Sequence, residues 1–290
     1  MCGRCVYTLS TARLARVANV DERNVHELPS GPCYNAGPTF KLPVVYQIGG
    51  ERAVRGMEWG LKPRFKTDVH LTTNNARSES IEKSKLYAPL LNKSRCILVV
   101  DAFYEWKTEG KLKRPFVLRC GDDVREVVIP RLTPVDEVWT DEQASKHEEV
   151  DRTQKVREFF LPPLVSPLLM GGLYDEYSGV FSFAVVTMEA TGEVAKIHDR
   201  MPLFLTPDDA ADWLDERKTY QELTRRVFSG SQELANKLFT FEVSQIVNSI
   251  KNQGADCVLS KQAQDDKQFS NGLGRFFVKS SPPSKKPKLV

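Results

Sequence analysis

Several features that would classify a chain at once are missing from this sequence. No stretch approaches the roughly 18 apolar residues that a membrane helix needs. The N-terminal segment MCGRCVYTLS contains no apolar run of signal-peptide length. No internal repeat is present. We therefore expect a chain that neither spans a membrane nor is secreted.

A strong net charge is missing too: the formal value is only +3 in 290 residues. Its distribution is more informative. Residues 261–290 carry seven basic and two acidic side chains, a charge of +5, whereas residues 122–159 carry 11 acidic and six basic ones, a charge of −5. The rest of the chain therefore holds +3. With so small an excess, affinity for a nucleic acid would depend on local clustering and on salt.

Metal-binding patterns are also scarce. There are four histidines and six cysteines, and without a secretion signal we expect the cysteines to be reduced. Cys2 and Cys5 form a CxxC pattern, which suits a redox pair or half of a zinc site. No second CxxC and no nearby histidine pair completes such a site. We expect no metal and no cofactor.

Hydrophobic residues make up 41% of the chain, enough for a folded core. Cys96–Val100 is a continuous apolar run, typical of a strand that is buried on both faces. Pro115–Cys120 follows a turn at 109–111 and predicts a hairpin. The other predicted strands are Pro43–Ile48 and Val180–Thr187, of which the second is the strongest strand pattern in the chain.

Helix signals are fewer. Thr11–Ala18 is predicted to be a helix capped by Ser10 or Thr11. For a helix over Asp208–Arg217, Thr206 is the expected N-cap and Pro207 the first-turn proline. A third helix is predicted over Ser231–Phe239. Together these elements indicate an α+β fold, mainly antiparallel β with packed helices.

The chain divides into residues 1–260 and a tail. Within the first part, the acidic residues of about 122–159 predict a surface insertion. After residue 260 the apolar pattern stops and Gln, Asp, Ser, Lys and Pro dominate. Residues 261–290 are therefore predicted to be disordered.

Cys2 has distinctive chemistry. A small second residue normally permits removal of the initiator methionine, which would give Cys2 a free α-amine beside its thiol. Amine and thiol have ordinary pKa values of about 8 and about 8.5, so both are partly available as nucleophiles at neutral pH. With an aldehyde, such a 1,2-aminothiol forms a Schiff base and then closes a five-membered thiazolidine. The plain alternative is that Cys2 is only a tolerated second residue.

Seven segments support the first interpretation. They are MCGR (1–4), YNAGPTF (34–40), WGLKP (59–63), NNARSES (74–80), DAFYEW (101–106), IHDRMP (197–202) and VSQIVNSIKNQG (243–254). In this order and spacing they resemble the SRAP family of abasic-site processing proteins over 1–260, apart from the acidic insertion. The chain is most similar in architecture to eukaryotic members, which also have an insert and a tail. The resemblance implies a single SRAP-like, barrel-like domain.

The resemblance also implies a reaction, a covalent thiazolidine crosslink between Cys2 and the aldehyde of an abasic site in single-stranded DNA. Asn75 would hold the Cys2 amine and the sugar. Glu105 would be the acid and base for sugar-ring opening, and His198 would assist Schiff-base formation and reversal. Without the resemblance, Glu105 would be interpreted as a solvated strand-end acid and His198 as a structural loop histidine.

Single-strand binding needs basic groups with aromatic rings for stacking. Arg95 is a further basic candidate, and Trp59 is at least as consistent with the core as with stacking. Phe65 stands where the family often has an aromatic pair, which makes it a candidate wedge at single-strand/duplex junctions. The predicted DNA-binding residues are Arg4, Asn35, Trp59, Phe65, Arg77, Trp106 and Arg200.

The tail holds two short motifs. Leu273, Phe276 and Phe277 form an i, i+3, i+4 apolar face that resembles a PIP-box, the motif that binds the sliding clamp. A generic hydrophobic patch is the alternative. Residues 283–288, PSKKPK, resemble a nuclear-localisation signal. We expect a monomer in the nucleus, on chromatin at replication forks.

Two other functions remain open at this stage. A cysteine-type peptidase or autopeptidase could use Cys2, Glu105 and His198, although Met1 is the only residue that precedes Cys2. A non-covalent reader of modified DNA bases would need no nucleophile. The crosslinking enzyme, with lyase- or hydrolase-like chemistry, is the prediction that the seven segments favour.

Overall fold

The apolar run at Cys96–Val100 forms the centre of the larger sheet. In the computed structural model, which describes residues 2–62, 73–121, 127–130 and 166–262, this run is β7 (Arg95–Val100), and all six of its residues are buried. It lies antiparallel to β4 (Lys41–Ile48) on one side and to β10 (Leu168–Tyr177) on the other. An apolar strand with two paired edges and two covered faces is what the sequence predicts.

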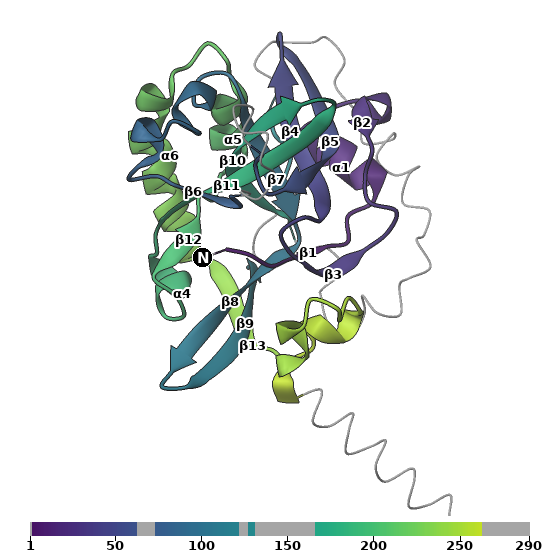
Figure 1. Ribbon diagram of the computed structural model, residues 1–290, viewed down its shortest axis with the longest axis vertical. Coiled ribbons are helices and arrows are strands. Elements are labelled where there is room, and N and C mark those ends of the chain that lie inside the picture. Colours follow the sequence, from purple (N-terminus) through teal and green to yellow (C-terminus); the bar gives the residue numbers. More distant parts are fainter. Residues whose placement is uncertain (1, 63–72, 122–126, 131–165, 263–290) are drawn as a thin grey trace, which may run out of the picture.

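The larger sheet closes on itself. β5 (Glu51–Trp59) pairs with β4, and β11 (Val180–Glu189) pairs with β10. A short parallel contact between β5 and β11, Ser182 with Glu58 and Phe183 with Trp59, joins the two ends. The five strands β11-β10-β7-β4-β5 therefore form a ring, which confirms the barrel-like α+β prediction (Figure 1).

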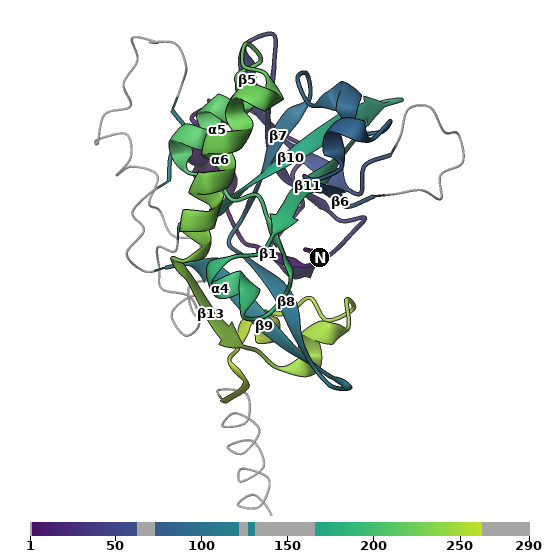
Figure 2. The ribbon, with the colours of Figure 1, turned by 90° about the vertical axis from the view of Figure 1, so that its left-hand side faces the viewer.

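Three short strands extend the ring, and the remaining five strands form a second sheet. β2 (Val25–His26) pairs with β5, while β6 (Asn75–Arg77) and β12 (Arg200–Pro202) both pair with β11. The second sheet has the order β13-β9-β8-β1-β3. Its strands are β1 (Cys5–Tyr7), β3 (Cys33–Ala36), β8 (Ala102–Glu109), β9 (Leu112–Cys120) and β13 (Leu238–Glu242). The predicted hairpin is β8–β9, which projects away from the ring (Figures 1 and 2).

Between β7 and β8 the chain crosses from the ring to the second sheet, and one residue, Asp101, forms this link. Its buried carboxylate accepts hydrogen bonds from the backbone N–H of Thr8, at 2.6 Å, and from the Thr8 hydroxyl, at 3.0 Å. Because Thr8 follows β1, these bonds fix the N-terminal strand at the corner where the chain changes sheets.

The helices agree with the sequence in part. Helix α1 (Thr11–Ala18) has the predicted bounds, and the Ser10 hydroxyl caps it. Helix α5 (Pro207–Leu214) has the predicted cap but ends before Arg217, because Asp215 leaves the helical region. The described residues also form α4 (Gly192–Ala195) and the 3-10 turns Glu22–Asn24, Ile81–Lys83, Ala88–Leu90, Gln245–Asn248 and Ala255–Val258.

The helix predicted over Ser231–Phe239 is wrong in its bounds. The helix there is α6 (Tyr220–Ala235), and the chain then enters strand β13. The missed signal is a capping box: the Thr219 hydroxyl accepts from the N–H of Glu222, and the Glu222 carboxylate accepts from the N–H of Thr219. Beyond residue 237 the chain pairs antiparallel with β9 (Leu112–Cys120), with Leu238 opposite Cys120.

The predicted surface insertion needs a correction at its start. Ile129 is fully buried, and its N–H donates to the carbonyl of Val17 at 2.8 Å. Arg52 donates to the carbonyls of Ile129 and Pro130 at 2.9 and 2.8 Å. Residues 127–130 therefore pack against α1 and β5, because Val127 and Ile129 are buried there while Val128 between them is exposed. Residues 122–126, 131–165 and the tail from 263 lie outside the described residues.

Candidate functional site

Cys2 lies where the two sheets meet. Its side chain is fully buried and belongs to the main hydrophobic cluster. The backbone N–H of Tyr104 donates to the carbonyl of Arg4 at 3.0 Å, so the pairing of β1 with β8 continues toward the start of the chain. Figures 1 and 2 show this end of the chain beside β1, β6 and β8. Residues from β6 and β8 are therefore in position to reach Cys2.

Asn75 reaches Cys2 from β6. Its side-chain Nδ2 donates to the carbonyl of Cys2 at 2.8 Å, and the Tyr87 hydroxyl donates to the Asn75 carbonyl at 3.1 Å. The Asn75 Oδ1 is buried and has no hydrogen-bond partner among the residues that the structure describes. A buried acceptor without a donor costs about 1–3 kcal/mol. This oxygen therefore has an unused acceptor position within the described part of the chain.

Glu105 reaches the same place from β8. Its side chain is 2% exposed, and burial raises the pKa of the carboxyl from its ordinary value to about 7. At neutral pH both protonation states are therefore populated. A carboxyl in this condition can donate and accept a proton in successive steps.

His198 follows α4, and hydrogen bonds hold both its backbone and its side chain. Its N–H donates to the carbonyl of Val194 at 2.9 Å, while its ring Nδ1 accepts from the backbone N–H of Arg200 at 2.9 Å. The ring Nε2 lies 3.9 Å from Oε2 of Glu105. The imidazole therefore points at the Glu105 carboxyl.

The contacts at Nδ1 fix the position of the imidazole proton. The carboxylate of Asp199 also lies 2.8 Å from Nδ1, but that side chain is 86% exposed and solvated, whereas the Arg200 amide is fixed in a strand. Nδ1 is then an acceptor, and the neutral ring carries its proton on Nε2. Burial lowers the pKa of His198, which favours this neutral form.

The thiol of Cys2 is not ionised at rest. Burial, and after it the charge of Glu105, raises the pKa of Cys2 far above its ordinary value. The site thus combines a neutral thiol, a carboxyl that titrates near neutrality, a neutral imidazole and an unused amide oxygen. This set suits proton transfers around an electrophile, but it does not suit attack by a preformed thiolate.

The predicted DNA-binding residues differ in how far they are exposed and in whether they already have partners. Arg77 is exposed at the end of β6. Trp106 is half-buried, and its Nε1 donates to Oδ1 of Asn248 at 2.6 Å. Arg200 is 14% exposed and pairs with Glu79 through two hydrogen bonds of 2.5 and 3.0 Å. Phe65 lies outside the described residues.

Three of the predicted nucleic-acid contacts have structural partners instead. Trp59 is fully buried, is stacked on Phe183, and donates to the carbonyl of Asn74, so the core interpretation of this ring holds. Arg95 is 5% exposed and donates to the carbonyls of Leu91, Trp213, Asp215 and Lys218. The amide of Asn35 is buried and donates to the carbonyls of Val247, Ser249 and Asn252. None of the three presents a free group to DNA in this conformation.

Arg4 lies beside Cys2 in sequence but is already engaged. Its guanidinium donates to Oδ1 of Asn35 at 2.8 Å and to the carbonyl of Val247 at 2.9 Å. It also lies over the Trp106 ring, 5.8 Å from the centroid. In this conformation Arg4 fastens residues 244–253 to the N-terminal strand.

Two residues that bind Arg200 were not predicted from the sequence. Glu79 stands in the NNARSES segment but received no role, and Thr187 lies on β11 with no motif around it. Arg200 donates to the Thr187 carbonyl at 2.8 Å, and Thr187 is fully buried. The single acid of the NNARSES segment was the available signal for Glu79, whereas Thr187 had no such signal.

Other kinds of site find no support in the described part of the chain. No group of three or more His, Cys, Asp or Glu side chains is arranged to hold a metal within 2–62, 73–121, 127–130 and 166–262. In the same residues, no helix is long and apolar enough to cross a membrane.

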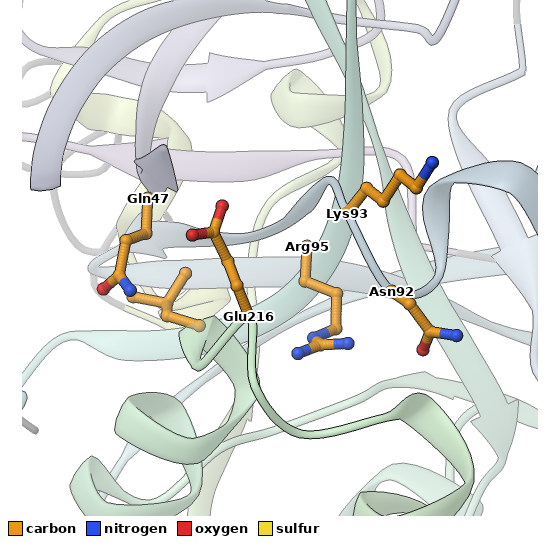
Figure 3. Close-up of a pocket in the computed structure, with 6 residues that line it drawn as sticks. Gln47, Asn92, Lys93, Arg95 and Glu216 are labelled. Atoms are coloured by element: carbon orange, nitrogen blue, oxygen red, sulfur yellow. The ribbon is translucent and has the colours of Figure 1, made fainter. Parts of the chain in front are cut away.

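A surface pocket lies elsewhere, and Figure 3 shows its lining. It is lined by Gln47, Asn92, Lys93, Arg95, Leu214 and Glu216. The Arg95 guanidinium is committed to backbone carbonyls, and Asn92 Oδ1 accepts from the N–H of Tyr220. The pocket shares no residue with the Cys2 site, so the candidate chemistry is not located there.

Comparison with known proteins gives one family. The family model described as SOS response associated peptidase (SRAP) matches residues 1–250. The chain is 29% identical over 291 aligned residues to the abasic site processing protein HMCES of Gallus gallus, covering 89% of this chain and 77% of that protein. It is 27% identical over 262 residues to the abasic site processing protein YedK of Escherichia coli, covering 89% and 99%.

Solved structures share the fold. A protein from Bacteroides thetaiotaomicron superposes with a TM-score of 0.56 at 18% identity, covering 87% of this chain and 97% of that one. A phage-related protein from Bordetella bronchiseptica gives a TM-score of 0.54 at 21% identity, covering 84% and 95%. At these identities the likeness concerns architecture alone.

Proposed function

This chain belongs to the SRAP family, and from that premise we propose that it recognises abasic sites in single-stranded DNA and captures them covalently through Cys2. The observation that carries the proposal is the meeting of Asn75, Glu105 and His198 at Cys2. The names of the relatives in chicken and Escherichia coli, abasic site processing proteins, support the choice of substrate.

The amine is proposed to react first. Removal of Met1 converts the amide nitrogen of Cys2 into a free α-amine, on the residue whose carbonyl accepts from Asn75 Nδ2; the Oδ1 of the same Asn75 amide has no partner among the described residues. The amine attacks C1′ of the open-chain deoxyribose aldehyde, a C–N bond forms, and water leaves to give the imine. Glu105, with a pKa of about 7, accepts and returns protons in these steps.

The thiol is proposed to react second. Because burial raises the pKa of Cys2, the sulfur attacks as its proton leaves rather than as a preformed thiolate. The C–S bond forms at C1′, the π electrons of the imine pass to nitrogen, and nitrogen takes up a proton. The product is a thiazolidine, and the whole sequence releases one water molecule.

His198 is proposed to assist both directions. Its Nε2–H faces Glu105, so the pair can pass a proton to the hydroxyl that leaves as water. By microscopic reversibility the same groups would add water to the imine when the crosslink opens. Arg77 and Arg200 are proposed to hold phosphates, with Trp106 and Phe65 against bases or a duplex end.

A peptidase is less well supported, although the family description contains that word. Cysteine peptidases use a thiolate whose pKa is lowered by a neighbouring histidine. Here burial raises the pKa of the Cys2 thiol, and the His198 Nε2 points at Glu105. Turnover of a peptide by the mature protein would revive this function.

The test is a denaturing gel with an abasic single-stranded oligonucleotide. The mature protein should give a shifted band whose mass equals protein plus DNA minus one water. Cys2→Ala should give no band, and an N-terminal tag that blocks the amine should give none either. Cys120→Ala is the matched control, because Cys120 is a half-buried cysteine on β9. A band of full strength from Cys2→Ala would refute the proposal.

The tail is proposed to direct the protein to nuclear replication forks. Its Leu273, Phe276 and Phe277 face and its basic end lie outside the described residues, so the support is the sequence pattern alone. Replacing all three apolar residues by Ala should abolish binding to a purified sliding clamp and leave crosslinking unchanged. Equal clamp binding by both proteins would eliminate this role.

A further inference from the structure

Arg200 is held on two sides by residues that the reaction above does not use. Its Nη1 and Nη2 donate to the two carboxylate oxygens of Glu79 at 2.5 and 3.0 Å. The same Nη2 donates to the carbonyl of Thr187 at 2.8 Å. The carboxylate of Glu79 matches the planar arrangement of the guanidinium N–H groups, so the two hydrogen bonds fix the orientation of the Arg200 side chain.

The anchor points belong to three adjoining strands. Glu79 comes two residues after β6, Thr187 lies on β11, and Arg200 begins β12. β11 pairs with both neighbours: Thr187 stands opposite Arg77 on one side and Pro202 on the other. The N–H of Ser78 also donates to the Thr187 carbonyl at 2.9 Å. The Glu79–Arg200 pair therefore bridges the two strands that flank β11.

The backbone of Arg200 connects this bridge to the candidate active site. Its N–H is the donor to Nδ1 of His198, and the Nε2 on the other side of that ring faces Glu105. Any displacement of the start of β12 therefore moves the donor that orients the imidazole. Burial of Glu79 is slight, and the Arg200 guanidinium lowers the pKa of its carboxyl, so Glu79 is an anion throughout the neutral range.

We propose that Glu79 is a positioning residue for His198: by clamping the Arg200 side chain it fixes the Arg200 N–H that sets the orientation of the imidazole toward Glu105. The inference rests on the proposed function, because it assigns a part to Glu79 in the crosslinking reaction. It differs from a role in binding, in which Glu79 would only compete with DNA phosphates for the Arg200 guanidinium.

The two roles give different kinetics. A positioning residue changes the rate at saturating DNA, because misplacement of a reacting group by about 1 Å costs up to about 100-fold. A competitor for phosphate changes the DNA concentration that gives half-maximal rate, and its removal makes binding tighter. Glu79→Gln keeps the size of the side chain and removes its charge, so it separates the two.

The experiment measures the crosslinking rate against DNA concentration for wild type, Glu79→Gln, His198→Ala and the double variant. Glu82→Gln is the matched control, a nearby exposed acid whose contact is Gln221 rather than Arg200. We expect Glu79→Gln to lower the saturating rate roughly tenfold or more, with little change for Glu82→Gln. In the His198→Ala background the Glu79 change should have no further effect.

A second readout does not depend on the reaction. The chain has four histidines, so the imidazole signals in an NMR spectrum can be assigned by deletion of His198. Glu79→Gln should shift the His198 ring signals of the free protein, and Glu82→Gln should not.

The outcomes separate the two proposals. If wild type forms no crosslink, the proposed function fails, while the NMR shift still tests the link from Glu79 to His198. If wild type reacts, three results overturn the positioning role. These are an unchanged saturating rate with tighter DNA binding, an equal loss in the His198→Ala background, and unshifted His198 signals.

Discussion

Two buried polar regions of this protein differ in how completely their groups are paired. Arg95, at the start of β7, donates to four backbone carbonyls and lies 5.9 Å from the Trp213 ring centroid. At the Cys2 site, Asn75 keeps a buried oxygen without a donor among the described residues, and Glu105 sits where burial raises its pKa. The saturated region holds the fold together. In the proposed function, the unsaturated region uses its unpaired acceptor and its titrating carboxyl for the DNA aldehyde.

The largest effect on stability is expected at the saturated region. Arg95→Met removes the donor to four carbonyls while keeping an apolar stem, so buried acceptors are left without partners. The free energy of unfolding should fall by about 3–5 kcal/mol, measured by urea denaturation. Lys93→Met, at an exposed neighbour, is the control and should change it by less than about 0.5 kcal/mol. Equal stability of the two variants would show that the paired region around Arg95 contributes no more to stability than an exposed position does.

Glu105→Gln should act in opposite directions on activity and stability. The crosslinking rate should fall by about 10²–10⁴-fold, because Gln cannot transfer a proton. The fold should gain on the order of 2–3 kcal/mol at pH 8, since a carboxyl with a raised pKa destabilises the folded state once it ionises. Rate measurements at saturating DNA and denaturation of the same sample check both.

The pH dependence gives a further check of Glu105. Its pKa is ordinarily 4.5 and about 7 in the fold, so the unfolded chain loses this proton first. Stability of the wild type should therefore fall between about pH 4.5 and pH 7 and then level off, and this component should be missing from Glu105→Gln. Parallel stability curves for the two proteins would show that Glu105 is not buried in this way.

Asn75→Ala should have an intermediate effect. It removes the donor to the Cys2 carbonyl and the free acceptor together, so the crosslinking rate should fall roughly 10- to 100-fold at saturating DNA. Stability should change by only about 1 kcal/mol, because one hydrogen bond is lost and one unsatisfied oxygen disappears with it. Asn74→Ala is the neighbouring control, whose side chain lies outside these contacts.

Much of the fold was accessible from the sequence because apolar strands and capped helices leave local signals. The ends of α1 and the course of β4, β7 and β11 follow from such signals. The structure at the start of the insertion could not be predicted in this way, because the burial of Ile129 depends on a distant partner on α1. The closure of β5 on β11 could not be predicted either, because it joins residues over 100 positions apart.

The candidate site was likewise predictable from the sequence for some residues and not for others. Asn75, Glu105 and His198 came from motif resemblance, and the geometry brings Asn75 to Cys2 and His198 to Glu105. Apart from Asn35, the predicted DNA contacts are charged or aromatic residues, and residue type does not reveal burial. Arg95, Asn35 and Trp59 are therefore structural here, although the residue types alone match a DNA-binding surface.

The smallest effect is expected for a residue that combines features of the two regions. Arg4 is beside Cys2 but bonds Asn35 Oδ1 and the Val247 carbonyl, so its pairing resembles that of Arg95. Yet it is only half-buried, so solvent can replace those partners, and Arg4→Gln should cost about 1–2 kcal/mol of stability. If phosphate takes the guanidinium when DNA binds, the variant should also weaken DNA binding and reduce the slope of log K against log salt by about one. Fluorescence anisotropy with intact single-stranded DNA at several salt concentrations measures this slope. An unchanged slope would assign Arg4 wholly to the fold, because a residue that keeps its carbonyl partners in the complex releases no counterion.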